Sequence, residues 1–114
     1  MAVRPLVRDL GDVDGRRMHA IAVEVWSDLV VVRWSVQRGF GPGDADLAAR
    51  GWSLNDDAGT AYAPHGSGGH GNDDHMRYEA DWRPAPPPDA RRLEVAYRDG
   101  AGHERLRELL ELGP

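Results

Sequence analysis

Three histidines spaced five residues apart are the first candidates for chemistry in this chain of 114 residues: His65, His70 and His75. Imidazole binds zinc and nickel, and the carboxylates of Asp73 and Asp74 would add oxygen ligands if the segment folded back on itself. The spacing matches no standard zinc motif. Closing a glycine-rich segment round a metal also costs about 1–2 kcal/mol of backbone entropy per fixed residue. The segment is therefore interpreted either as a metal site or as solvated polar residues.

A second acidic group lies in the sequence Asn55-Asp56-Asp57-Ala58-Gly59. Carboxylate and backbone oxygens are the ligands of Ca²⁺, and Asp73 and Asp74 would join Asp56 and Asp57 if the two segments converged. The alternative is structural, because Asp and Asn side chains accept hydrogen bonds from their own turns. Both interpretations stay open.

Catalytic motifs are weak. Gly66-Ser-Gly-Gly-His-Gly71 has the form G-x-G-x-x-G, but no predicted helix follows it and no parallel βαβ unit surrounds it. Ser, His and Asp all occur, yet there is no G-x-S-x-G nucleophile elbow. We expect a protein that is not an enzyme, with no catalytic residue and no cofactor.

The composition excludes several chemistries. All 14 basic residues are Arg, and the chain contains neither Lys nor Cys. Schiff-base catalysis and phosphate-binding P-loops need a lysine, while disulfides, iron–sulfur clusters and thiolate zinc sites need cysteine. Stability must therefore come from packing.

The net charge is −5, which gives no overall field for gathering phosphates, so we expect no nucleic-acid partner. Near the N-terminus, Arg4, Arg8 and Asp9 interrupt any apolar run that a signal peptide would need. No segment has the length and hydrophobicity of a membrane span. The sequence thus predicts a cytoplasmic protein without a membrane partner.

Alternating hydrophobicity predicts strands along most of the chain. In residues 75–82, Met76, Tyr78, Ala80 and Trp82 share one face, which is typical of a half-buried strand. Trp52–Asn55 and Thr60–Ala63 flank the turn residues 55–59 and predict a hairpin. Of the four tryptophans, Trp82 beside Arg83-Pro84 is expected to be the most exposed. The predicted strands are 3–13, 17–26, 29–36, 52–55, 60–63, 75–82 and 93–97.

Between the strands, residues 64–74 are almost devoid of hydrophobic side chains and predict an exposed, flexible Gly/His-rich loop. The Pro-rich stretch 83–89 predicts a stiff connector that crosses between sheets. Residues 37–44 predict another loop, and 46–50 are left open between a helical turn and a poor strand. Residues 104–112 are compatible with a strand, which we prefer, or with a short C-terminal helix in place of the last strand.

These patterns predict one all-β domain over residues 1–114, an antiparallel β-sandwich of about seven or eight strands. The run Asp56-Asp57-Ala58-Gly59-Thr60-Ala61-Tyr62, the following Gly-rich segment, then Trp82-Arg-Pro-Ala-Pro-Pro-Pro-Asp-Ala90 and Leu93-Glu-Val, resembles small immunoglobulin-like domains of uncharacterised actinobacterial proteins. That resemblance implies an immunoglobulin-like sandwich and brings no known catalytic residues with it.

The expected function is therefore non-catalytic: an interaction module that contacts another protein, or a second copy of itself as a homo-oligomer, through an exposed sheet face or edge strand. The alternative is a metal-dependent domain that binds Ca²⁺ or Zn²⁺ through the Asp-rich turns or the His-rich segment.

Overall fold

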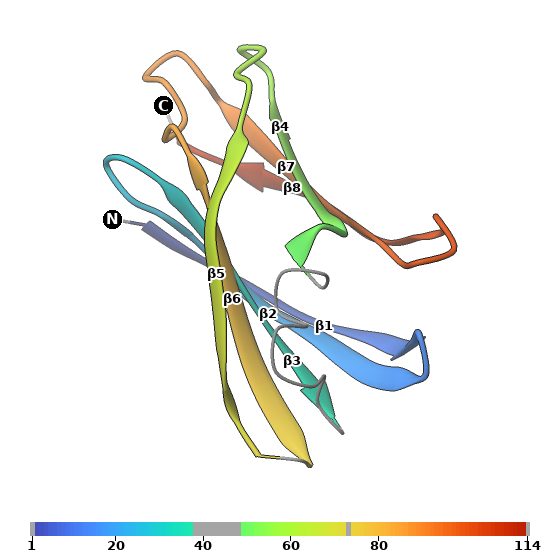
Figure 1. The fold of residues 1–114 in the computed structure, drawn as a ribbon. Helices are drawn as coiled ribbons and strands as arrows, with labels where there is room; N and C mark the ends of the chain where they lie inside the picture. The colour runs from blue at the N-terminus through green and yellow to red at the C-terminus, as the bar shows by residue number, and fades with distance from the viewer. Residues whose placement is uncertain (1, 38–48, 73, 114) are drawn as a thin grey trace.

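The computed structural model describes residues 2–37, 49–72 and 74–113, which form an all-β arrangement of eight antiparallel strands in two sheets (Figure 1). The first sheet has five strands in the order β1-β2-β3-β6-β5, and the second has three in the order β4-β7-β8. The strands are β1 (Ala2–Val13), β2 (Arg16–Val25), β3 (Val30–Gln37), β4 (Trp52–Asp56), β5 (Ala63–Gly71), β6 (His75–Arg83), β7 (Arg92–Arg98) and β8 (Glu104–Glu111).

Hydrophobic residues that alternate with polar ones along the strands form the core between the two sheets. On β6 the predicted inward residues Tyr78, Ala80 and Trp82 are buried, while the residues between them are more exposed. They pack against the inward residues of β3 and of the second sheet. The expectation for Trp82 was wrong: its side chain is 4% exposed, and Trp26 in the turn after β2 is the exposed tryptophan, at 42%.

Aromatic rings form the centre of this core. The Trp52 ring on β4 lies 5.5 Å from that of Trp34 on β3 and 4.9 Å from that of Tyr97 on β7, and Trp34 stacks on Tyr78 at 5.8 Å. Trp52 therefore joins the two sheets by direct ring contacts.

The predicted hairpin over residues 52–63 is wrong. β4 pairs with β7 in the three-stranded sheet, and the chain then crosses to the other sheet, where β5 begins at Ala63. Short alternating runs beside a turn do not specify which strands pair, because the pairing depends on which sheet buries each face.

The predicted loop over residues 64–74 is also wrong in its first part, since residues 63–71 form β5, paired along its length with β6. Its exposure agrees with the prediction, because eight of its nine residues are exposed. Glycines carry no side chain that could produce a hydrophobic pattern, so the pairing with β6 determines the extended backbone. The Pro-rich connector leads from β6 in one sheet to β7 in the other, as the sequence predicted.

The C-terminal segment is a strand and not the alternative helix. β8 pairs with β7 from Glu104 to Glu111 and buries Leu106, so the sheet overrides local helix propensity. The predicted loop at 37–44 lies, apart from Gln37 in β3, outside the described residues, as does most of the open segment 46–50. No helix in the described part of the chain is long and apolar enough to span a membrane.

Hydrogen bonds connect the two sheets on one side of the molecule, where β1 and β8 meet. The Arg105 guanidinium on β8 donates to the carbonyl oxygens of Leu10 (2.9 Å) and Asp12 (2.8 Å) on or beside the end of β1. The Asp14 carboxylate in the β1–β2 turn accepts a hydrogen bond from the backbone N–H of Gly100 at 3.1 Å. β1 and β8 therefore lie together as a closed side of the sandwich.

Candidate functional site

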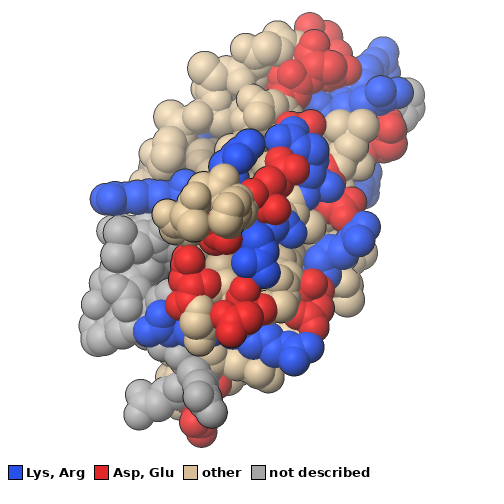
Figure 2. All heavy atoms as spheres, turned by 90° about the vertical axis from the view of Figure 1, so that its right-hand side faces the viewer, with Lys and Arg blue, Asp and Glu red and all other residues tan. Residues whose placement is uncertain are grey.

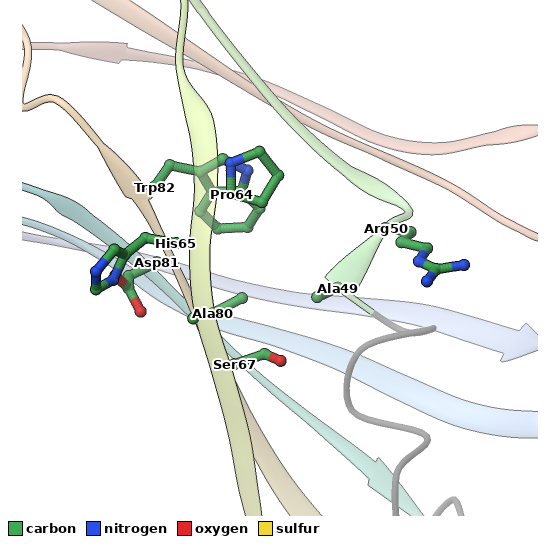
Figure 3. Close-up of a pocket in the computed structure, with 9 residues that line it drawn as sticks. Ala49, Arg50, Pro64, His65, Ser67, Ala80, Asp81 and Trp82 are labelled. Atoms are coloured by element: carbon green, nitrogen blue, oxygen red, sulfur yellow. The ribbon is translucent and has the colours of Figure 1, made fainter.

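A shallow pocket of about 260 Å³ lies on the opposite side of the molecule, at the start of β5 (Figure 3). A serine, a histidine, an aspartate and an arginine are among the residues that line it, and their side-chain types are the ones most often used for chemistry. Its lining residues are Ala49, Arg50, Pro64, His65, Gly66, Ser67, Ala80, Asp81 and Trp82.

Ser67, His65 and Asp81 do not assemble into a catalytic group. Ser67 is paired with the inward-facing Ala80, whereas Asp81 is paired with Gly66 and belongs to the opposite face of the sheet. In Figure 3 the His65 and Asp81 side chains lie together on one side of β5, and Ser67 extends to the other. Nucleophilic catalysis needs the nucleophile within hydrogen-bond reach of its base, which this arrangement does not provide.

His65 lies within hydrogen-bond distance of Asp81, with 2.7 Å between the imidazole Nδ1 and the carboxylate Oδ2. The pair is open to solvent, since the His65 side chain is half exposed. A register shift between Pro64 and Gly66 positions it, because the extra residue turns His65 towards Asp81 on the outer face.

The other histidines lie further along the same two strands. His70 is paired with Arg77, and His75 begins β6 opposite Gln37 of β3. Asp74 is in the β5–β6 turn, and Asp73 lies outside the described residues. Within residues 2–37, 49–72 and 74–113, no three His, Asp or Glu side chains are grouped so as to hold a metal ion.

Asp56 stabilises the chain segment that follows β4. Its carboxylate accepts hydrogen bonds from the backbone N–H groups of Ala58 (2.9 Å) and Thr60 (3.0 Å) and from the Tyr62 hydroxyl (2.6 Å). Partial burial acts to raise the pKa of Asp56, but the hydrogen bonds from Tyr62, Thr60 and Ala58 together outweigh it and hold the pKa below its usual value. The carboxylate is thus already used as a turn cap.

Asp57 has a similar role at longer range. It accepts hydrogen bonds from the backbone N–H groups of Arg91 (2.8 Å) and Arg92 (3.3 Å), and the first of these is the main reason that the pKa of Asp57 is lowered. It therefore ties the turn after β4 to the connector before β7.

Acid should weaken the fold partly through Asp56. A carboxyl whose pKa is lower in the folded state than in the unfolded chain stabilises the fold fully above its unfolded pKa, and this contribution is lost as the pH falls through the folded value. In Asp56→Asn that titration is absent. We expect the melting temperature of the wild type to fall more steeply than that of Asp56→Asn below about pH 4. Calorimetric scans between neutral and acidic pH test this, and parallel curves would contradict it.

Surface charges are intermixed. Figure 2 shows blue and red side chains interspersed over the centre and right of one face, with no extended area of one sign there. Ion pairs such as Arg8–Glu108 and Arg107–Glu94 account for part of this mixture. An intermixed surface does not have the single-sign field that attracts polyanions.

Asp81 is the residue of the pocket that sequence reasoning missed as a partner of His65. Its place on the outer face was readable from the alternation of residues 75–82, but the neighbouring strand was not. Arg50 was also missed; its guanidinium points away from the pocket in Figure 3.

Comparison with known proteins identifies no relative: no protein-family model matches the chain, and neither the curated proteins nor the solved structures include a significant match.

Proposed function

We propose that this chain is a non-catalytic, immunoglobulin-like module that binds another protein or a second copy of itself. The strand order supports the immunoglobulin-like assignment. In constant-type immunoglobulin domains, strands A, B, E and D form one sheet and C, F and G the other. Here β2-β3-β6-β5 and β4-β7-β8 follow the same order, with β1 added beside β2.

The arrangement of the core supports the immunoglobulin-like assignment as well. Antibody domains place a buried Trp on strand C against a disulfide between strands B and F. In this chain Trp52 is on β4, in the position of strand C. Its ring contacts Trp34 on β3 and Tyr97 on β7, in the positions of B and F. Aromatic contacts therefore take the place of a disulfide in a chain without cysteine.

The observation that carries the binding role is the outer edge of β5, beside which no other strand of the described residues lies. β5 is the last strand of its sheet and contains no Asp, Glu or Arg over nine residues. Exposed edges present backbone donors and acceptors to other chains, and charged residues are a common protection against such pairing. An edge without these charged side chains supports recognition by strand addition.

Sedimentation equilibrium tests the proposal. If the module self-associates, the mass should rise with concentration towards that of a dimer. If it binds another protein, an immobilised form should retain a saturable partner from the cells that produce it, and excess free protein should displace that partner. A chain that stays monomeric at high concentration and retains no such partner would contradict the proposal.

A further inference from the structure

The four outer strands of the two sheets differ in how well they are protected against pairing. β1 has two register shifts and a positive φ of 45° at Val7, and Arg105 occupies the carbonyl of Leu10. β8 lies against β1, and β4 has only five residues. Bulges, covered edges and short strands are the devices that keep edges from pairing. β5 has one register shift, near its start, keeps one register with β6 from Gly66 to Gly71, and has a positive φ only at Gly71, its last residue.

A hydrogen bond in the β5–β6 turn indicates which backbone groups of β5 face away from β6. The N–H of Asn72, the residue after β5, donates to the carbonyl oxygen of His75 at 3.0 Å, so the N–H at this position faces β6. Hydrogen-bonded and non-hydrogen-bonded pairs alternate along antiparallel strands, so the N–H and C=O groups of Gly69 face away from β6. Among the described residues, none forms a backbone hydrogen bond with them on that side.

Nothing in the described part of the monomer requires glycine at position 68. A Cβ at Gly69 would meet the Tyr78 ring at 2.6 Å, and one at Gly71 would meet the His75 carbonyl oxygen at 2.2 Å. A Cβ at Gly68 would meet nothing within 4 Å, and its φ is not positive; no other glycine in the described ranges combines these two properties. Glycine within a strand weakens it, and often marks the close approach of another chain.

Gly69, next to Gly68 on β5, is a glycine that an aromatic ring covers. On the inner face, the Tyr78 ring of β6 lies over Gly69, its cross-strand neighbour. On the outer face Gly68 lacks such a ring from β6, because its neighbour there is Glu79. Two residues further along β5, on the same face, is the exposed ring of His70.

We propose that two copies of this chain pair antiparallel along the outer edge of β5, with Gly69 opposite Gly69 of the second copy. This inference rests on the self-association form of the proposed function. In this register the two Gly69 residues exchange N–H···O=C hydrogen bonds. Gly68 then lies opposite His70 of the second copy, so each imidazole covers the glycine of the other chain. β5 itself contributes no like charges to oppose the contact.

Cysteine cross-linking tests the register, and the chain has no other cysteine to interfere. Opposed residues of a non-hydrogen-bonded pair have Cα atoms about 4.5 Å apart, within the reach of a disulfide, whereas diagonal residues at about 7–8 Å are beyond it. Under mild oxidation, a mixture of Gly68→Cys and His70→Cys should therefore form about tenfold more disulfide-linked dimer than either variant alone. The matched control is a mixture of Gly68→Cys with His65→Cys, which should not cross-link above background.

A second variant, Gly68→Lys, tests dimerisation in the absence of a disulfide cross-link. Lysine in Gly68→Lys has open space in the monomer and lies beside Glu79, but in the dimer it would displace the imidazole of His70. We expect the wild type to sediment as a concentration-dependent dimer and Gly68→Lys to require at least about tenfold more protein to dimerise, with an unchanged circular dichroism spectrum.

The outcomes separate the two proposals. A wild-type dimer whose cross-linking does not exceed the control, and which Gly68→Lys leaves unaffected, overturns the β5 pairing while the self-association function stands. A wild type that is monomeric at all concentrations overturns the pairing and also the self-association form of the function. A wild-type dimer with the mixed disulfide and with weakened association of Gly68→Lys supports both.

Discussion

Replacing Trp52 with Ala should lower the free energy of unfolding by about 3–5 kcal/mol, the range found when large aromatic side chains are removed from cores. The side chain is 4% exposed and touches Trp34 from one sheet and Tyr97 from its own. Its loss would leave a cavity where the sheets meet. Urea denaturation followed by far-ultraviolet circular dichroism measures the change.

Trp52→Phe and Trp26→Ala are informative controls. The Trp52 indole N–H is buried and has no hydrogen-bond partner among the described residues, so phenylalanine removes an unsatisfied donor, which offsets part of the lost packing. Trp52→Phe should therefore cost clearly less than Trp52→Ala. Trp26 is exposed, and its replacement should change stability by about 0.5 kcal/mol or less. Equal losses for Trp52→Ala and Trp26→Ala would contradict the placement of Trp52 at the centre of the core.

Gly51→Val should lower the free energy of unfolding by about 2–3 kcal/mol, as overpacking does in a space closed by backbone. A Cβ at Gly51 would lie 2.5 Å from both the Arg98 carbonyl oxygen and the Tyr97 ring. The Gly51 carbonyl also accepts a hydrogen bond from the Arg98 N–H at 2.9 Å, so the two backbones cannot separate without breaking it.

The matched control for Gly51→Val is Gly68→Ala, measured at low protein concentration so that the monomer is observed. Because a Cβ at Gly68 meets open space, alanine should leave stability unchanged or raise it by about 0.5–1 kcal/mol. Thermal melts of the two variants side by side provide the comparison. If Gly51→Val melts at or above the temperature of the wild type, the close approach of Gly51 to β7 is wrong.

Most strands could be predicted from sequence because one face of each is buried. β6 is the clearest case, since Tyr78, Ala80 and Trp82 alternate with polar residues. β5 could not be predicted, because four of its nine residues are glycine and no side-chain pattern distinguishes a paired Gly-rich strand from a loop. Its strand character comes from the hydrogen bonds that β6 supplies.

The candidate site was harder to predict than the fold. The sequence correctly flagged Asp56 as a possible turn cap, because such capping is local to a few residues. The contact of His65 with Asp81 joins residues that are 16 apart, and it depends on a register shift in β5 that leaves no sequence signature. Contacts of this kind follow from strand register, which a single sequence specifies weakly in glycine-rich segments.

The hydrogen bonds between β1 and β8 bear on which strand of the native structure unfolds locally first. Arg105 and Asp14 connect the two sheets through the carbonyls of Leu10 and Asp12 and the amide of Gly100, so separating the sheets on that side breaks several hydrogen bonds at once. β5 is held in its sheet by one neighbour and buries little side-chain surface. In the monomer we therefore expect local fluctuations to begin at β5, whose amide hydrogens should exchange with solvent without global unfolding, whereas amides in β7, between β4 and β8, should exchange only when the whole domain opens.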